Sequence, residues 1–444
     1  MPVDCGELVP EWNECHALPE AVSRLRLKLY QKAKQDEKFR FYSLYGHVLR
    51  LDVLMAAWDL VRRNKGAPGV DGVTIDQIEH AEGGPQRFVG ELNEALRSRS
   101  YKPSPVRRVY IPKPDGGERP LGIPTVRDRV VQTAVLLVLE PIFEADFRGC
   151  SYGFRPGRGA HQAVREIDGH LSGGLKEVYD ADLKGYFDSI PHDKLRRALR
   201  MRLADRSVLK LIDLWLQAPV ADERKGGPPQ RNRTGTPQGG VISPLLANVY
   251  LHWFDVLFQA ANGPGTWAKA KLVRYADDFV ILARYQGQRL QDWVRETLET
   301  RMGLVINQGK TRVVNLTQTG ASLDFLGFTF RYDRDRYLRE RRYLNVFPSK
   351  KAQARARARL RDLTAASQCF QPIPEVIVRV NRFTAGWASY FAALGYPRKA
   401  LRDLNRYVQL RLACHLERRS QRPYRPPKGI SFYRHLAHLG LMYR

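Results

Sequence analysis

The chain has 444 residues, of which 43% are hydrophobic, and a formal net charge of +27 at pH 7. Its size suits two or three compact modules. The five cysteines are scattered and include no C-x-x-C pair, which argues against a secreted protein framed by disulfides. No apolar run is long enough to cross a bilayer, which argues against a membrane protein. A positive surplus this large makes a compact protein repel itself unless a polyanion neutralises it, so nucleic acid is the expected partner, in a reducing cytosol.

The first stretch of the chain, to about Arg63, is predicted to be helical. Its apolar residues recur at three- and four-residue steps, which places them on one face of a helix: Leu51, Leu54, Trp58 and Val61. The helix should stop before the glycine- and proline-rich segment 64–72. Lys65 and the backbone amides of this segment could meet phosphate, although composition supports an ordinary connecting loop equally well.

From Tyr101 to about Arg334, short β-branched or aromatic runs alternate with helical segments, a pattern typical of an α+β domain. Residues 106–112 and 119–123 flank a turn with two glycines and are expected to form a hairpin. Residues 271–282 read as two apolar strands broken by a pair of acids, which predicts a second hairpin.

Beyond about Phe347 helical periodicity takes over and predicts a helical bundle. Two apolar stripes mark its helices, one of Val376, Val380, Phe383, Trp387 and Phe391 and one of Leu401, Leu404, Val408 and Leu412. Residues 331–444 hold 26 basic and 7 acidic side chains, a surplus of 19. The basic run that includes Arg355, Arg357 and Arg359 is expected to grip RNA or a duplex, with a solvated surface as the alternative.

Three acids are candidates for catalysis. Asp277 and Asp278 lie between the two apolar runs of the second hairpin, and Asp182 ends the strand-like run 178–183. An isolated Asp-Asp pair is usually a hydrated turn. Brought together with Asp182, however, the pair would supply the carboxylate oxygens that Mg²⁺ requires, and phosphoryl transfer uses such ions to neutralise developing charge.

The ordered set of motifs resembles the reverse transcriptases encoded by group II introns, often called maturases, and the resemblance runs nearly end to end. Eight segments carry it: Asn64-Lys-Gly-x-x-Gly-Val-Asp-Gly72, Ile111-Pro-Lys-Pro-x-Gly-Gly-x-Arg-Pro-Leu-Gly-Ile123, Ser151-Tyr-Gly-Phe-Arg-Pro156, Asp182-Leu-Lys-Gly-Tyr-Phe-Asp188, Pro237-Gln-Gly-Gly-Val-Ile-Ser-Pro-Leu-Leu-Ala-Asn248, Tyr275-Ala-Asp-Asp278, Gly303-Leu-Val-Ile-Asn-Gln-Gly-Lys310 and Phe325-Leu-Gly-Phe328.

The resemblance implies an α+β right-hand polymerase, with fingers and a palm built on an antiparallel sheet, followed by an all-α thumb and maturase bundle. We expect an N-terminal helical extension with the fingers loop at 1–100, the reverse transcriptase fingers and palm at 101–335, and the thumb or maturase domain at 345–420. A basic C-terminal tail is expected at 421–444. Localisation in the bacterial cytosol or nucleoid follows from the same family.

The family also implies roles for single residues. Asp182, Asp277 and Asp278 correspond to the catalytic metal ligands, and the Leu183 carbonyl lies where such sites place a further contact. The implied cofactor is two Mg²⁺ ions, with Mn²⁺ as an alternative. Lys310 corresponds to a lysine proposed to protonate the departing pyrophosphate. Asp188 is better explained as a cap of the helix that follows it.

Four residues correspond to contacts with the incoming dNTP: Lys113, Arg119, Phe187 and Gln238. The first two look like finger residues that hold the triphosphate. Phe187 falls where the family places an aromatic ring that crowds the sugar 2′ position, with core packing as the alternative. Tyr152, Phe154 and Arg155 resemble a segment that contacts template or nucleotide, with core packing equally supported for the two aromatics. The residues expected to bind nucleic acid are Lys65, Arg155, Arg355, Arg357 and Arg359.

Three functions stay open at this point. The first is an enzyme that copies RNA into DNA, binds its parent intron RNA and assists splicing and retromobility. The second is a domesticated relative in phage defence, DNA repair or CRISPR adaptation. The third is a non-catalytic RNA-binding splicing cofactor, whose mark would be eroded acids. No HNH endonuclease motif follows the bundle, so cleavage of a second DNA strand is not expected. The sequence does not indicate the oligomeric state.

Overall fold

The computed structural model describes residues 18–112, 116–222, 224, 226, 228–335, 342–419 and 424–444. The chain divides into two compact units. The first unit contains residues 1–159, 181–280 and 287–312, and the second contains residues 160–180, 281–286 and 313–444. Among the described residues, no helix is both long enough and apolar enough to cross a membrane.

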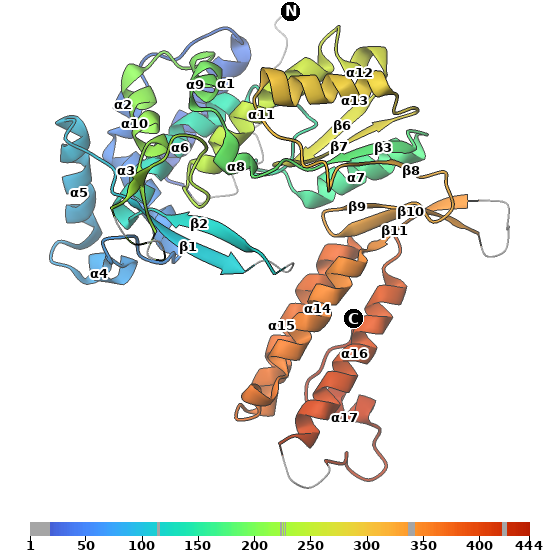
Figure 1. Cartoon of the computed structure of the whole chain (residues 1–444). Helices are drawn as coiled ribbons and strands as arrows, with labels where there is room; N and C mark the ends of the chain where they lie inside the picture. The colour runs from blue at the N-terminus through green and yellow to red at the C-terminus, as the bar shows by residue number, and fades with distance from the viewer. Residues whose placement is uncertain are drawn as a thin grey trace, which may run out of the picture. The chain divides into compact units, whose positions relative to one another are not determined.

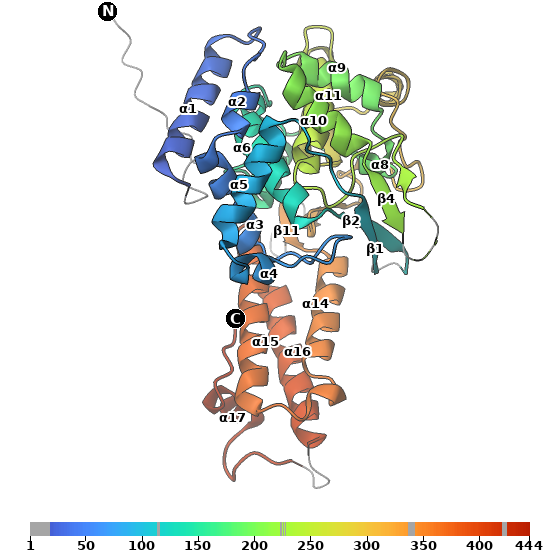
Figure 2. The ribbon, with the colours of Figure 1, turned by 90° about the vertical axis from the view of Figure 1, so that its left-hand side faces the viewer.

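The first unit opens with a layer of helices around α6 (Figures 1 and 2). Both α1 and α3 pack against α6, and α5 packs against α3. The elements are α1 (Glu20–Gln35), α2 (Tyr45–Val48), α3 (Leu51–Arg63), α4 (Ile75–His80), α5 (Gly84–Arg97) and α6 (Val126–Glu144). The predicted helix before residue 64 is confirmed as α3, but Leu51 at its first position is 55% exposed and does not join the buried stripe.

A four-stranded sheet in the order β2-β1-β4-β5 follows in the first unit. Its strands are β1 (Val106–Pro112), β2 (Glu118–Ile123), β4 (Pro219–Asp222) and β5 (Gln230–Arg231). The predicted hairpin is confirmed, because β1 and β2 pair antiparallel with Arg108 opposite Gly122. Strand β4 joins β1 in parallel.

The remaining helices of the first unit are α8 (Tyr186–Ser189), α9 (His192–Arg200), α10 (Arg206–Leu216), α11 (Ser243–Gln259), α12 (Pro264–Trp267) and α13 (Gln288–Arg295), the last continued by the π-helical segment η2 (Glu296–Arg301). Helix α11 is buried over most of its length, with Leu246, Tyr250 and Phe254 in the core. It is the element to which the acidic turn is attached.

The sheet that carries the acids has the strand order β6-β7-β3-β8. Its strands are β6 (Lys271–Tyr275), β7 (Asp278–Ala283), β3 (Glu177–Ala181) and β8 (Arg312–Asn315). The predicted hairpin at 271–282 is confirmed as β6 and β7. The apolar residues Phe279 to Ala283 of β7 are all buried, which explains why the run reads as continuously hydrophobic.

The second unit contains α7 (Ala160–Ser172) and a three-stranded antiparallel sheet in the order β11-β10-β9. The strands are β9 (Leu323–Phe325), β10 (Phe328–Arg334) and β11 (Arg342–Pro348). Phe330 of β10 lies opposite Val346 of β11, and both side chains are buried. Helix α7 packs against β11.

The predicted helical bundle is confirmed. In both ribbon views α14, α15 and α16 run side by side, and α17 lies near the start of α15 and the end of α16 (Figures 1 and 2). The helices are α14 (Lys350–Leu363), the short η3 (Ala366–Gln368), α15 (Ile373–Ala392), α16 (Arg398–Glu417) and α17 (Phe432–His438). The apolar stripes meet in one core that includes Leu360, Val380 and Leu412.

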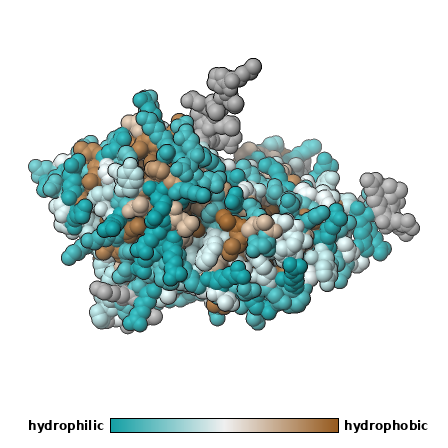
Figure 3. Space-filling model, turned by 90° about the horizontal axis from the view of Figure 1, so that it is seen from above, coloured by the Kyte–Doolittle hydropathy of each residue, from teal (hydrophilic) through white to brown (hydrophobic). Residues whose placement is uncertain are grey.

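The expectation of a basic tail at 421–444 is wrong for its described part. Residues 432–438 form α17, whose Leu436 is 0% exposed, and Leu441 after it is also buried in the bundle core. All the charged side chains of this segment are basic, but its apolar residues dock it, because Tyr424, Phe432 and Leu439 also pack against the bundle core. The face seen in Figure 3 is mostly hydrophilic, with small separate apolar patches.

Candidate active site

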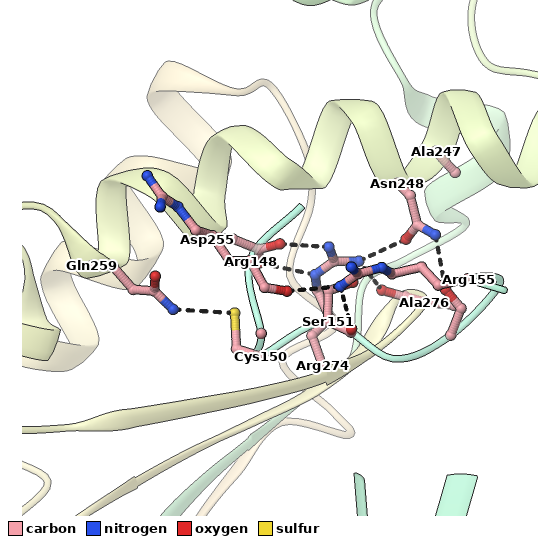
Figure 4. Close-up of polar contacts among 12 residues, drawn as sticks. Arg148, Cys150, Ser151, Arg155, Ala247, Asn248, Asp255, Gln259, Arg274 and Ala276 are labelled. Carbon is pink, nitrogen blue, oxygen red and sulfur yellow. Dashed lines mark hydrogen bonds and ion pairs between the residues drawn. The ribbon is translucent and has the colours of Figure 1, made fainter. Parts of the chain in front are cut away.

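The turn between β6 and β7 carries Asp277 and is held in an uncommon conformation. Ala276, just before it, has a φ of 57°, a left-handed value that a non-glycine residue adopts rarely and at some cost. Its carbonyl oxygen accepts a 3.0 Å hydrogen bond from Nη1 of Arg274 (Figure 4). The side chain two residues upstream therefore fixes the backbone that presents Asp277.

Arg274 is one half of a buried ion pair with Asp255 of α11, and both side chains are 0% exposed. Two contacts join the pair, Nη2 to Oδ2 at 2.6 Å and Nε to Oδ1 at 3.0 Å (Figure 4). Nη1 also donates to Oδ1 of Asn248 at 3.0 Å. A bidentate pair of this kind is strong and directional, so it attaches the turn to α11.

The loop 148–155 is fastened to the same turn. The Tyr152 N–H donates to the Arg274 carbonyl at 2.8 Å, and Nδ2 of Asn248 donates to the Gly153 carbonyl at 2.8 Å. A β-carbon on Gly153 would lie 2.4 Å from the backbone nitrogen of Ala276, a distance no side chain tolerates. Glycine is therefore required here by close approach of two backbones.

Asp182 directly follows β3 and is held by the segment that ends at Lys310. Its Oδ2 accepts a 2.8 Å hydrogen bond from Nδ2 of Asn307 and lies 3.6 Å from Nζ of Lys310. The Asn307 N–H also donates to the Asp182 carbonyl at 2.8 Å. The Lys310 side chain is 65% exposed, so solvent screens this ion pair and its contribution to stability is small.

The electrostatics of Asp277 show which charges gather around it. Burial raises the pKa of its carboxyl above the ordinary value, and the negative charge of Asp182 raises it further. The backbone N–H of Asp277 and the guanidinium groups of Arg119 and Arg274 act in the opposite direction. Asp182 and the predicted finger arginine Arg119 thus both lie within electrostatic range of Asp277.

This arrangement fits a cation. Two like charges held near each other in a partly buried place repel, and a divalent ion bound to both oxygens would relieve that repulsion. Within the described residues, no three acidic, histidine or cysteine side chains form a ready-made metal cluster. The site therefore offers a pair, Asp182 and Asp277, and the assignments of Asp278 and of the Leu183 carbonyl as further ligands stay predictions.

Phe187 lies on α8, half-buried, between two other aromatic rings. Its ring centroid is 5.6 Å from that of Tyr186 and 6.2 Å from that of Phe154, both in edge-to-face geometry. The Phe187 carbonyl accepts a 2.7 Å hydrogen bond from the N–H of Thr236, just before Pro237. Its proposed contact with the nucleotide sugar is untested, but it is not simply a core residue.

Gln238 lies in a loop that is tied on two sides. Its carbonyl accepts a 2.5 Å hydrogen bond from the N–H of Gly122 in β2, and its Nε2 donates to Oδ2 of Asp188 at 3.3 Å. The expectation that Asp188 caps the next helix is wrong, because α9 begins after Pro191 and Asp188 lies within α8. The carboxylate binds the Gln238 side chain instead.

The other predicted contacts divide into three groups. Lys113 lies outside the described residues. Lys65 is exposed in the predicted loop, and Arg355, Arg357 and Arg359 are exposed on α14, so all four are open to a ligand. Arg155 is not: it is 6% exposed, and it pairs with Glu144 at 2.5 Å and donates to the Ser151 carbonyl at 2.7 Å. Its predicted contact with nucleic acid is corrected to a structural role.

Sequence reasoning did not single out several residues that build the site: Asn248, Asp255, Arg274 and Asn307. Asn248 and Asn307 stand inside quoted motifs, yet nothing in their spacing shows which group they contact. A signal was present for Arg274, since an arginine inside an apolar strand needs a buried partner. Its partner could not be identified, because Asp255 lies in the part of α11 beyond the motif that ends at Asn248.

Two family models match the chain. The model described as reverse transcriptase (RNA-dependent DNA polymerase) matches residues 111–330, and the group II intron maturase-specific domain matches residues 353–429. A solved structure of apo telomerase from Candida tropicalis, 14% identical, covers 56% of this chain and 59% of its own with a TM-score of 0.39.

Among curated proteins, the chain is 34% identical to protein YkfC of Escherichia coli over 75% of this chain and 94% of that protein. It is 38% identical to the group II intron-encoded protein LtrA of Lactococcus lactis over 48% of this chain, and the match spans 35% of LtrA. The predicted fold class, a polymerase of mixed α and β structure followed by a helical region, is confirmed. The chain belongs to the group II intron-encoded reverse transcriptase and maturase family, and its enzymatic class is RNA-directed DNA polymerase.

Proposed function

We propose that the chain copies RNA into DNA at the acidic pair of Asp182 and Asp277, with dNTPs as substrates and two Mg²⁺ ions, or Mn²⁺, as cofactor. The observation that carries the proposal is that Asp182, which follows β3, and Arg119 both act electrostatically on Asp277 in the turn between β6 and β7. Bound divalent ions supply the charge that polymer extension needs, by neutralising the reacting phosphoryl group. Asp182 and Asp277 would hold them, with Asp278 and the Leu183 carbonyl as further ligands.

The chain's own residues have distinct tasks in this proposal. Arg119, together with Lys113, binds the triphosphate, for which a rigid guanidinium and a flexible ammonium are suited. Gln238 contacts the nascent base pair from its tied loop. Phe187 excludes the 2′ hydroxyl of a ribonucleotide. Lys310 protonates the departing pyrophosphate, and its Nζ, 3.6 Å from the Asp182 carboxylate, supports that place.

Primer extension on an RNA template with dNTPs and Mg²⁺ tests the polymerase. Asp277→Asn removes the charge but keeps the shape of the side chain, and we expect it to abolish extension. Asp76→Asn, at an exposed aspartate in the first turn of α4, is the matched control and should extend normally. Equal extension by wild type and Asp277→Asn would refute the proposed site.

We also propose that the chain binds a group II intron RNA and assists its splicing and mobility. The match of residues 353–429 to the maturase-specific domain and the surplus of 19 positive charges in residues 331–444 support this. The test is splicing of an intron transcribed from the DNA that flanks the gene, with and without the protein. A flank without an intron, combined with active primer extension, would favour the domesticated relative; a splicing protein without extension would favour the non-catalytic cofactor.

A further inference from the structure

Phe154 combines two features that are rare in a residue without a functional role. It is a large apolar residue that is 53% exposed, and its backbone has a φ of 56°. The left-handed region is costly for any residue with a β-carbon, and a bulky aromatic residue is a true outlier there. Strain of this kind persists only where the surroundings impose it, and it concentrates at functional sites.

Both neighbours of Phe154 impose the conformation. Gly153 is fixed by its carbonyl on Asn248 and by its close approach to Ala276. Arg155 is buried, with its guanidinium on Glu144 and on the Ser151 carbonyl (Figure 4). The chain between these two anchors can only project the Phe154 side chain outward. Asn248, which holds Gly153, also binds Arg274, and Arg274 holds the turn that carries Asp277, so the position of the ring is linked to that of the turn.

The projected ring contacts Phe187. Their centroids are 6.2 Å apart and their planes meet at 78°, an edge-to-face pair. The other neighbour of Phe187 is Tyr186, whose ring is 5.6 Å away, whose side chain is 2% exposed and whose hydroxyl donates to the Ala247 carbonyl at 2.6 Å. Phe187 therefore stands between one buried, immobilised ring and one exposed ring held by strained backbone.

We propose that Phe154 is a specificity-determining residue that buttresses Phe187 and so sets the discrimination between deoxyribonucleotides and ribonucleotides. This rests on the proposed role of Phe187 as the residue that excludes the 2′ hydroxyl. A single half-buried ring is a poor steric barrier, because it turns to another rotamer when a hydroxyl presses on it. The Phe154 ring packs edge to face against Phe187, and this contact makes the barrier stiff.

The test is the ratio of kcat/KM for dCTP to that for CTP in single-nucleotide extension on an RNA template. Phe154→Asn removes the ring but tolerates left-handed backbone, so the loop keeps its conformation. We expect the ratio to fall about three- to tenfold, the range that the energy of an aromatic pair corresponds to. Phe154→Tyr keeps the ring and should keep the ratio. Tyr285→Asn, at an aromatic residue that is 75% exposed, is the control for loss of a surface ring.

Phe187→Ala and the double variant of Phe154→Asn with Phe187→Ala complete a double-mutant cycle. We expect Phe187→Ala to lower the ratio more than Phe154→Asn does, and Phe154→Asn to have little further effect in the Phe187→Ala background. If Phe187→Ala lowers the ratio and Phe154→Asn does not, the buttress is refuted while the barrier stands. If neither changes the ratio, both assignments fall. Equal loss of kcat/KM for dCTP and CTP in Phe154→Asn would show a merely structural residue and also refute the inference.

Discussion

Opposing influences act on the carboxyl group of Asp277. Burial and the neighbouring Asp182 raise its pKa, while its own N–H and the charges of Arg119 and Arg274 lower it. A cation bound to the carboxylates of Asp182 and Asp277 would also lower the pKa of Asp277. Protonation and cation binding therefore compete for the same oxygens, and a fixed positive charge from Arg274 limits how far the balance moves toward the proton.

His252 on α11 provides a residue-scale test of burial near the site. Its ring lies 5.6 Å from that of Phe147, and burial lowers its pKa from 6.5 to about 4. The unfolded chain therefore binds this proton more readily than the folded one. The contribution of the neutral His252 to the free energy of unfolding is fully present above pH 6.5. It is lost as the pH falls from 6.5 toward 4, and the loss amounts to up to about 3 kcal/mol.

We expect His252→Phe to flatten this pH dependence. The measurement is the free energy of unfolding in urea at pH 7.5 and pH 5, and the difference between the two should shrink in the variant. His80→Phe, at an exposed histidine of α4, is the control and should leave the difference as in wild type. If wild type and His252→Phe lose the same free energy of unfolding between pH 7.5 and pH 5, His252 is not a buried neutral histidine.

At the scale of elements, α11 acts as the frame of the active site. Asp255 and Asn248 both lie on this helix, and together they hold the strand residue Arg274, the turn at Ala276 and the loop at Gly153. Three segments far apart in the sequence are thus joined through one arginine. The position of Asp277 depends on the packing of α11 rather than on the hairpin alone.

Removal of one partner of the buried ion pair of Arg274 and Asp255 should destabilise the protein strongly. Arg274→Met leaves Asp255 charged and unpaired in the interior, so the free energy of unfolding should fall by roughly 3–5 kcal/mol. Arg87→Met removes the exposed pair with Glu91, whose side chains are 62% and 65% exposed, and should cost less than about 1 kcal/mol. Chemical denaturation measures both. Similar losses in the two variants would show that the buried pair does not anchor the turn.

A second substitution separates charge from packing in this pair. The double variant Arg274→Met with Asp255→Leu removes the unpaired charge and should recover part of the stability lost in Arg274→Met. It does not restore the hydrogen bond to the Ala276 carbonyl, so primer extension should stay impaired. Full recovery of both properties would mean that the position of the turn does not depend on Arg274.

Much of this architecture could be predicted from the sequence because it is local. The hairpins at 106–123 and 271–283 follow from alternating or continuous apolar runs around turn residues, and the acids stand out between such runs. The contacts that finish the site are not local: Asn307 meets Asp182 across 125 residues, and Asp255 meets Arg274 across 19. The sequence predicts a ligand contact for Arg155 because it is an arginine within a motif, whereas in the structure its side chain is buried and pairs with Glu144.

For the whole molecule, charge is distributed unevenly. Residues 331–444 hold a surplus of 19 of the total of 27 positive charges. On α14 the buried positions Ala352, Ala356 and Leu360 alternate with exposed arginines. The helix thus packs through one face and leaves its arginines exposed to solvent, where they can contact phosphate backbones.

Replacing Arg355, Arg357 and Arg359 together by glutamine should weaken RNA binding and reduce its salt dependence. Each lost phosphate contact lowers the magnitude of the slope of log K against log salt by about 0.7 to 0.9, so this magnitude should fall by about 2 to 3. The control replaces three exposed basic residues elsewhere, Lys28, Arg206 and Lys210. Equal slopes for the two variants in filter-binding titrations would make α14 an ordinary solvated surface.

Single-turnover incorporation of one dNTP on a preformed RNA–primer complex shows whether Asp182 and Asp277 act as one catalytic pair. Asp182→Asn, Asp277→Asn and the double variant are compared with wild type, with complex formation measured separately. Each single variant should lose at least about a thousandfold in rate, the double variant should lose little more, and all should bind the complex. Incorporation within tenfold of wild type by either single variant would show that the two carboxylates do not act as one pair.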